Sequence, residues 1–170
     1  MDGTLRKESR VGLGIDVVEI ARMEAILERT PSFKRIYSES ERTYCESTAH
    51  PATHYATRFA AKEAVLKALG TGFAEGVTPN DVEVRRNAKG KPICSLHGRA
   101  KEIAQELGVR DLPISLSYTH TEAVACAMAI TEDSARAELE RLNPMEQLSN
   151  RFKEARMFLD DIDASFAPEE

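Results

Sequence analysis

RFAAKEAVLKALGTG, residues 58–72, predicts most of a central helix that spans 55–69 and ends in a glycine-rich loop. Alanine and leucine are strong helix formers, and paired glycines typically end a helix. At about 100° per residue, Glu63 falls at the border of the apolar stripe, between Phe59 and Lys67. An i,i+4 ion pair with Lys67 would explain Glu63 at a few tenths of a kcal/mol. The alternative is a carboxylate with a chemical role.

Outward from this helix, strands and helices alternate irregularly, which favours an α+β fold over a parallel doubly wound sheet. Ser38 and Glu41 have the spacing of a capping box, and AHPATH at 49–54 reads as a breaker. The apolar segment 123–130 is expected to be a central strand. The predicted strands are 11–18, 81–86, 93–96, 113–118 and 123–130, and the predicted helices are 19–29, 38–48, 55–69 and 99–108.

The charge distribution divides the chain. Residues 133–170 hold ten acids and five bases and so carry the whole net charge of −5. They contain helical patterns and predict an acidic helical extension that packs on the body or on a neighbouring subunit. Residues 1–10 are polar and predict a flexible leader. The domain is therefore expected to span 11–132.

Several classes of protein are disfavoured by composition. Residues 1–132 are neutral overall and show no basic field for nucleic acid. No run reaches the roughly 18 apolar residues of a membrane span, and the polar start lacks a signal-peptide core, so a cytoplasmic protein without membrane contact is expected. Cys45, Cys94 and Cys126 stand far apart, which is typical of reduced thiols rather than of a zinc site.

Asp16 is a second acid of interest. It lies at the end of the predicted strand, on the face that it shares with Gly12 and Gly14, and two glycines allow something to approach closely. Asp16 could simply cap the following helix. However, one acid from a strand end and one from a helix border suit Mg²⁺, which typically takes one or two protein carboxylates. Asp16 and Glu63 are therefore the candidate metal ligands.

Basic residues beside Glu63 suggest a phosphate-containing ligand. Lys67, Lys62 and Arg58 on the same helix would face phosphates. The Gly70-Thr71-Gly72 loop could offer N–H groups to an anion or let a nucleotide base lie close. It is not a Walker motif, because no Gly-Lys-Ser/Thr follows. His120 lies in a loop between two predicted strands, where a lone histidine can equally be incidental.

Four motifs in this order resemble holo-acyl-carrier-protein synthase, the short branch of the 4′-phosphopantetheinyl transferases. They are GIDVVEIARME, RFAAKEAVLKALGTG, NAKGKP and ISLSYTHTEAVACA, and together they cover about 11–130. The resemblance implies a compact α+β fold with an antiparallel sheet and packed helices. It also implies a homotrimer with coenzyme A sites between subunits.

The resemblance implies an activity in fatty acid and lipid biosynthesis. Such an enzyme moves the phosphopantetheine arm of coenzyme A to a serine of apo acyl carrier protein and releases adenosine 3′,5′-bisphosphate. Asp16 and Glu63 match the family's metal ligands, and Lys67 matches the lysine that meets the diphosphate. By the same resemblance, Arg58, Gly70 and Pro92 would hold coenzyme A, and Arg22 on the first helix would receive the acidic carrier protein. Further candidates are Lys62, Ser117, Tyr118 and His120 for coenzyme A and Arg29 for the carrier protein.

The last motif departs from the family pattern, and three other classes of protein stay open. The family reads S-H-T directly after the strand, whereas here Tyr118 follows Ser117 and His120 comes later, so either Tyr118 or His120 takes the histidine's place. A coenzyme A-binding module without transfer activity would not need the Asp16–Glu63 pair. A Mg²⁺-dependent phosphohydrolase would usually have more carboxylates. A purely structural partner would not explain the central motifs. Separately, Arg22 and Arg29 could be ordinary surface charges.

Overall fold

The structure is a computed structural model. It describes residues 11–72, 74, 76–136, 149, 152–153 and 156–157. The chain divides into two units, Met1–Glu132 and Asp133–Glu170, and each is considered by itself. The predicted leader 1–10 and most of the predicted extension 133–170 lie outside the described residues, so both stay predictions. None of the described helices is long and apolar enough to cross a bilayer.

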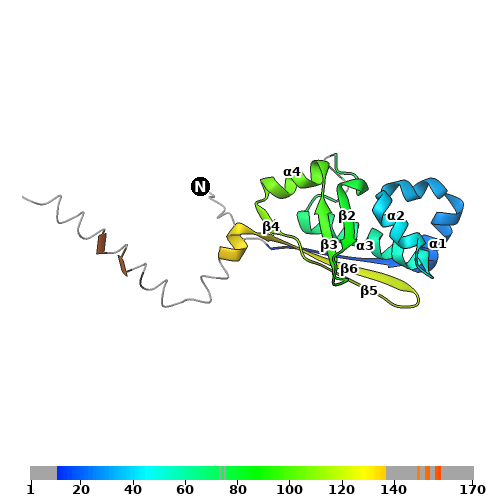
Figure 1. The fold of residues 1–170 in the computed structure, drawn as a ribbon. Coiled ribbons are helices and arrows are strands. Elements are labelled where there is room, and N and C mark those ends of the chain that lie inside the picture. Colours follow the sequence, from blue (N-terminus) through cyan, green and yellow to red (C-terminus); the bar gives the residue numbers. More distant parts are fainter. Residues whose placement is uncertain are drawn as a thin grey trace, which may run out of the picture. The chain divides into compact units, whose positions relative to one another are not determined.

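The first unit has the predicted α+β architecture (Figure 1). Along the chain, its helices and strands are β1 (Gly12–Glu19), α1 (Ile20–Arg29), the 3-10 helix η1 (Pro31–Ile36), α2 (Glu39–Glu46), α3 (Pro51–Leu69), the 3-10 helix η2 (Pro79–Asp81), β2 (Val82–Arg86), β3 (Pro92–Leu96), α4 (Gly98–Glu106), β4 (Val109–Asp111), β5 (Ile114–Tyr118) and β6 (Glu122–Thr131).

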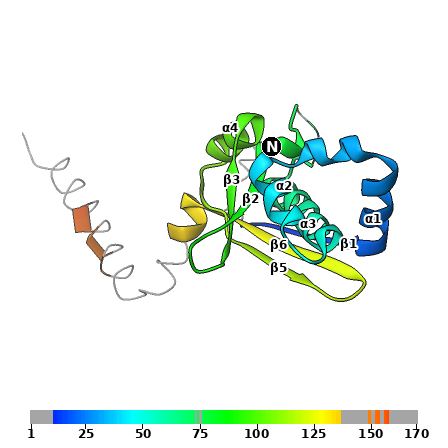
Figure 2. The same cartoon turned by 45° about the vertical axis from the view of Figure 1, so that its right-hand side comes forward.

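All strand pairs are antiparallel. β6 is the central strand of the larger sheet, as its apolar sequence predicted. β1 runs along one side of it, and β5 and β4 share the other side. β2 and β3 form a separate hairpin, and Figures 1 and 2 show it beside the larger sheet. The sheet therefore brings the first strand of the domain beside its last.

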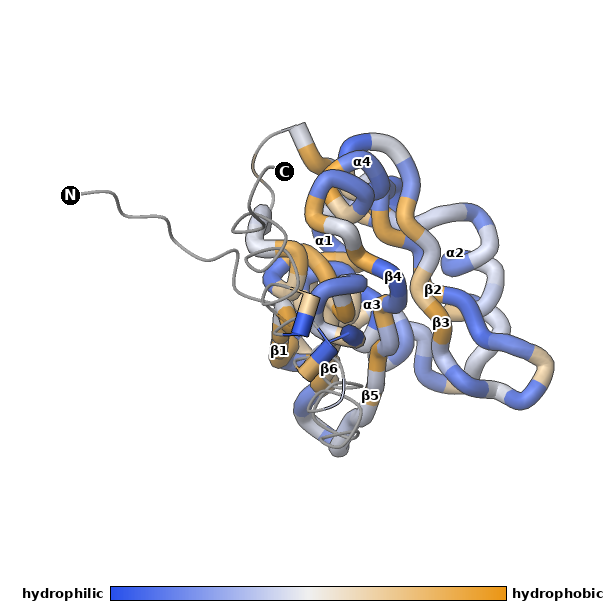
Figure 3. The backbone as a smooth tube through the Cα atoms, turned by 90° about the vertical axis from the view of Figure 1, so that its left-hand side faces the viewer, coloured by the Kyte–Doolittle hydropathy of each residue, from blue (hydrophilic) through white to orange (hydrophobic). Residues whose placement is uncertain are grey.

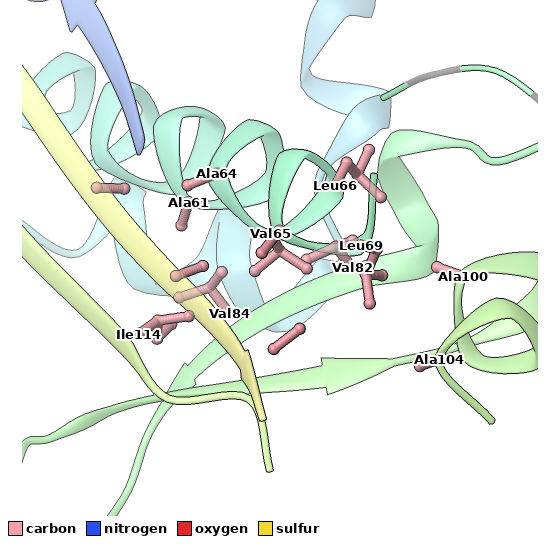
Figure 4. Packing of buried hydrophobic residues seen from close by; sticks show 14 of the residues in the cluster. Ala61, Ala64, Val65, Leu66, Leu69, Val82, Val84, Ala100, Ala104 and Ile114 are labelled. Carbon is pink, nitrogen blue, oxygen red and sulfur yellow. The ribbon is translucent and has the colours of Figure 1, made fainter. Parts of the chain in front are cut away.

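α3 packs against both sheets and is buried along most of its length. Figure 4 shows Val65 and Leu69 of α3 close to Val82 and Val84 of β2. The helix begins at Pro51, four residues before the predicted start. The breaker assigned to 49–54 was wrong, because proline at the first helical position loses no helical hydrogen bond there.

Gly12 and Gly14 allow α3 to lie unusually close to β1. A Cβ on Gly12 would lie 1.9 Å from the carbonyl oxygen of Ala68, and one on Gly14 would lie 1.9 Å from that of Ala64. On β6, alanines alternate along the same face, and Ala123, Ala125, Ala127 and Ala129 are all buried. The close approach inferred from these glycines is thus made by α3 itself.

The opposite face of the sheet is apolar and exposed. Leu13, Ile15 and Val17 of β1 are 59%, 53% and 54% exposed. The register places Leu13 opposite Met128, which is 39% exposed, and Ile15 opposite Cys126. Figure 3 shows the hydrophobic residues that run along β1 and β6. In this chain alone, an apolar sheet face therefore has no cover among the described residues.

Candidate functional site

Asp16, Glu63 and Lys67 come together where β1 crosses α3. Asp16 lies on the face of β1 that looks toward the helix, and its side chain is only 16% exposed. The Lys67 ammonium donates to Asp16 Oδ1 at 2.7 Å and to the carbonyl of Ile15 at 3.1 Å. Lys67 thus pairs with Asp16, and not with Glu63 as the simple helix pairing would have it. Asp16 does not cap α1 either, since Glu19 is the N-cap residue and makes no side-chain cap.

The environment of Glu63 disfavours its ionised form. Partial burial raises the pKa of Glu63, the neighbouring charge of Asp16 raises it further, and Lys67 acts in the opposite direction. Two carboxylates that repel each other in this way are relieved by a cation placed between them. In this structure, the Lys67 ammonium supplies part of that charge from one side.

The donor set fits Mg²⁺. Both acids provide hard oxygen ligands, and Mg²⁺ usually keeps water or phosphate oxygens in its remaining positions. Among the described residues, no group of three or more His, Cys, Asp or Glu side chains is placed to hold a metal ion. Asp16 and Glu63 are therefore the residues that could hold a Mg²⁺ ion that also binds a phosphate-containing ligand.

A cleft of about 500 Å³ adjoins the two acids. It is bounded by β1, by α1 and by the Phe59–Glu63 turn of α3. Its walls combine charged and apolar side chains, which suits a ligand with both kinds of surface. The lining residues are Asp16, Val17, Val18, Glu19, Arg22, Met23, Ile26, Phe33, Phe59 and Glu63.

A second group of candidate residues gathers at Tyr44. The Arg58 guanidinium lies 4.0 Å from the Tyr44 ring centre, and that of Arg86 lies 5.4 Å from it. The His54 ring contacts both Tyr44 and Tyr118 edge to face, at 5.4 and 5.9 Å. Burial lowers the pKa of His54, and the charges of Arg58 and Arg86 lower it further. We call these five residues the Tyr44 cluster.

The Tyr44 cluster carries cations without balancing acids. Among the described residues, neither Arg58 nor Arg86 has a carboxylate within ion-pair distance. Arg58 is 3% exposed, and its buried Nε atom has no hydrogen-bond partner within the same part of the chain. Pro92 stands opposite Arg86 in the β2–β3 register. This cluster is suited to an anion.

Lys62 does not belong to either group. It is fully buried, and its ammonium binds Glu41 and two backbone carbonyls, so the prediction that it faces phosphates is corrected. On the helix it precedes Glu63 by one residue, which turns the two side chains about 100° apart. Gly70 has a local explanation as well: it ends α3 with φ +80°, a conformation that favours glycine.

The remaining candidates lie at the surface. Ser117 is on the exposed face of β5, and His120 is at the exposed tip of the β5–β6 hairpin. A hydrogen bond from the amide of Ile20 to the carbonyl of Thr121 holds this tip beside the start of α1. Arg22 lines the cleft, whereas Arg29 is exposed in the last turn of α1.

Sequence reasoning missed the apolar lining of the cleft and three of the five residues of the Tyr44 cluster, namely Tyr44, His54 and Arg86. Ile26 carried a signal, because it lies on the apolar stripe of α1, but Phe33 sits in a short 3-10 helix that was not predicted. His54 was assigned to a breaker. Arg86 follows a strand pattern that offers no sign of its contact with Tyr44.

Similarity to known proteins identifies the class to which this fold and site belong. Residues 12–129, more than half of the chain, match the 4′-phosphopantetheinyl transferase superfamily, and the chain belongs to this superfamily. The holo-[acyl-carrier-protein] synthase of Geobacter sp. (strain M21) is 46% identical over 123 residues, which cover 71% of this chain and 97% of the relative. That of Syntrophus aciditrophicus (strain SB) is 45% identical over 116 residues, or 67% and 91% of the two chains.

Solved structures agree with these relatives. The crystal structure of Helicobacter pylori holo-[acyl-carrier-protein] synthase in complex with coenzyme A is similar, with a TM-score of 0.59 and 30% identity. The similarity covers 68% of this chain and 96% of that one. The resemblance drawn from the motifs is therefore confirmed, as are the α+β fold and the class of enzyme, a phosphopantetheinyl transferase.

Proposed function

We propose that this chain transfers the 4′-phosphopantetheine arm of coenzyme A to a serine of apo acyl carrier protein, with Mg²⁺, and releases adenosine 3′,5′-bisphosphate. The observation that carries the proposal is the cluster of Asp16, Glu63 and Lys67 at the end of a cleft, in the fold of this superfamily. The name of the relatives supports acyl carrier protein as the acceptor. The Helicobacter pylori complex supports coenzyme A as the donor.

In the proposed reaction, the serine oxygen attacks the phosphorus that carries the pantetheine arm. A P–O bond forms to serine, the bond from that phosphorus to the bridging diphosphate oxygen breaks, and its electron pair leaves with the bisphosphate nucleotide. The serine proton passes to a base, for which we propose Glu63. Glu63 lines the same cleft as Asp16, so its carboxylate is open to a hydroxyl that enters there.

Charge neutralisation is the second requirement, because phosphoryl-type transfer depends mainly on positioning and electrostatics. Asp16 and Glu63 are the residues that would hold Mg²⁺, which when bound neutralises the charge of the diphosphate. Lys67 adds a cation from the side of β1. Its side chain is 47% exposed, so its ammonium can bind a phosphate oxygen without leaving the cluster.

The carrier protein is proposed to dock on α1. Arg22 points into the same cleft as Asp16 and Glu63, and Arg29 lies two turns further along the helix. Two cations on one helix suit an acidic partner, and the apolar lining beside Arg22 gives that partner a surface to bury. The target serine would then approach Glu63 from the α1 side.

The other end of coenzyme A is assigned to the Tyr44 cluster. Arg58 and Tyr118 were expected to contact it, and the uncompensated charge of Arg58 and Arg86 supports a phosphate there. Pro92, which lies opposite Arg86, is still proposed to contact coenzyme A. The same proposal is kept for Gly70, Ser117 and His120. Lys62 is left out because its buried ammonium already donates to Glu41 and to two backbone carbonyls.

A homotrimer, which the family resemblance implied, is part of the proposal, and two features of the structure support self-association. Arg58 and Glu63 project from α3 about 140° apart, so one copy cannot easily present both groups to one ligand. The exposed apolar face that contains Leu13, Ile15 and Val17 is the kind of surface that marks an interface. Sedimentation equilibrium should give the mass of three chains, and Ile15→Asp should give one. A parent protein that sediments as a monomer would contradict the assembly.

The test of the transferase is intact-mass spectrometry of apo acyl carrier protein after incubation with this protein, coenzyme A and Mg²⁺. The expected result is a mass gain of one phosphopantetheine group, which EDTA abolishes and which Asp16→Ala and Glu63→Ala reduce by orders of magnitude. Lys34→Met, at an exposed ion pair with Glu46, is the matched control and should not reduce it. No gain with several carrier proteins, but binding of coenzyme A, would favour the alternative of a binding module without transfer activity.

A further inference from the structure

Lys62 and Glu41 form an ion pair that is closed off from water. Their side chains are 1% and 0% exposed, and Lys62 Nζ lies 2.9 Å from Glu41 Oε2. The pair joins α3 to the first turn of α2. A charge pair in such a place loses its hydration on folding, and this loss is offset only when both groups are fully hydrogen-bonded.

Both partners meet that condition. Besides Glu41, the Lys62 ammonium donates to the carbonyls of Pro79, at 3.1 Å, and Val82, which gives each of its three protons an acceptor. Glu41 Oε2 also accepts from the amide of Ser38, at 2.8 Å, and Oε1 accepts from the amide of Val84, at 3.0 Å. One side chain of α3 is thereby fixed to α2, η2 and β2 at once.

Stability alone does not explain the pair. Replacing a buried ion pair by apolar side chains of similar volume is often neutral or stabilising. What an apolar side chain cannot do is fix a direction, because hydrophobic contact is non-directional. Three hydrogen bonds from one ammonium define where the tip of residue 62 lies, and so define the rotation of α3 about its axis.

The rotation of α3 matters because the next residue is Glu63. On the other side of the helix, Gly12 and Gly14 fix how close α3 lies to β1. Because a glycine has no side chain to interlock with the helix, these contacts resist a rotation of α3 about its axis only weakly. Side-chain tips lie about 5–6 Å from a helix axis, so a 10° rotation moves a carboxylate by about 1 Å. A misplacement of about 1 Å can cost a reaction about 100-fold.

We infer that the Lys62–Glu41 pair is a positioning device that sets the rotation of α3 and so holds Glu63 in register with Asp16. The inference rests on the proposed function and deepens it. Lys62 does not touch coenzyme A; it acts through Glu63. Mg²⁺ demands near-ideal octahedral geometry, so its affinity is the property most sensitive to this register.

The test uses the full chain with Glu41→Gln and Lys62→Met together, since either change alone leaves a buried group without its partner. The double variant should keep the circular dichroism spectrum and the melting temperature of the parent within a few degrees. Its dissociation constant for Mn²⁺, a Mg²⁺ substitute visible by electron paramagnetic resonance, should rise about tenfold, and kcat should fall 10- to 100-fold. The matched control, Glu46→Gln with Lys34→Met, removes an exposed Lys–Glu pair and should leave both unchanged.

Unchanged Mn²⁺ affinity and kcat in the folded double variant would overturn the inference and leave the pair a purely structural role. If the double variant does not fold, Lys62→Arg takes its place in the test. This variant keeps the positive charge but changes the positions of its hydrogen bonds to Glu41, Pro79 and Val82. It should weaken Mn²⁺ binding in the same direction, and parent-like binding would again overturn the inference. A parent chain that binds Mn²⁺ but transfers nothing would refute the proposed function, and the Mn²⁺ comparison would still test the positioning role.

Discussion

Gly14→Ala tests whether the distance between β1 and α3 sets the geometry of the site. The added Cβ would lie 1.9 Å from the carbonyl oxygen of Ala64 and 2.7 Å from the amide nitrogen of Ala68. Real Cβ atoms essentially never come within 3.0 Å of such atoms, so β1 must move away from the helix by about 1 Å. Asp16 lies two residues further along the same face and moves with the strand.

The cost follows from the kind of atoms involved. Overpacking costs about 1–3 kcal/mol, and we expect the upper end because backbone atoms cannot rotate away. For a protein of this length, about 3 kcal/mol lowers the melting temperature by about 6–12 °C. Calorimetry checks this value. Below the transition, kcat should fall by up to about 100-fold, because Asp16 has moved relative to Glu63 by about 1 Å.

The control is Gly108→Ala, at a glycine with φ +69° and no atom within 4 Å of its added Cβ. This variant places alanine in a left-handed backbone conformation, which is strained, but it creates no clash and lies outside the site. It should lower the melting temperature by less and leave kcat intact. If Gly14→Ala melts and turns over like the parent, the close approach does not set the geometry of Asp16.

Two further predictions concern Glu63 and Arg22. The pKa of Glu63 in the folded protein is raised above its ordinary 4.5. Ionising this group therefore lowers the free energy of unfolding, and the loss develops as pH rises from the ordinary pKa through the raised one. Glu63→Gln should therefore raise the melting temperature in EDTA at pH 7 but not below about pH 4, and an equal gain at both pH values would refute this explanation. Arg22→Glu should raise the KM for carrier protein about tenfold, or about 1.4 kcal/mol, with the KM for coenzyme A nearly unchanged; steady-state kinetics with each substrate varied would show an unaltered carrier KM if the docking surface is elsewhere.

Features that depend on neighbouring residues were predictable from the sequence. The Ser38–Glu41 capping box is present with both of its hydrogen bonds. The β2–β3 hairpin forms around Asn87, whose side chain accepts from the amides of Lys89 and Lys91 in the predicted turn. In each case the deciding contact lies within four residues, so the local pattern contains it.

Features that depend on distant residues were not. Lys62 was predicted to face phosphates because it lies beside Glu63 in the sequence, and only its ion pair with Glu41, on another helix, shows that it does not. Gly12 and Gly14 are a second example. Their sequence predicts that another group approaches β1 closely, but it does not show that this group is the backbone of α3. Asp16 and Glu63 were predicted to lie together because their chemistry, and not their spacing, suggested a shared ion. Both residues line one cleft, and the shared ion stays a prediction.

The pairing of β1 with β6 has a consequence for how the protein is made. Among the described strands, β1 pairs only with β6, more than a hundred residues later in the chain. At about 5–20 residues per second, a ribosome needs about 5–20 s to supply that partner. Until then, an apolar strand with two open edges is exposed to other nascent chains, and Asp16 has no fixed place. The proposed site is therefore among the last features to form, and a chain that stops before β6 is a candidate for chaperones and proteases.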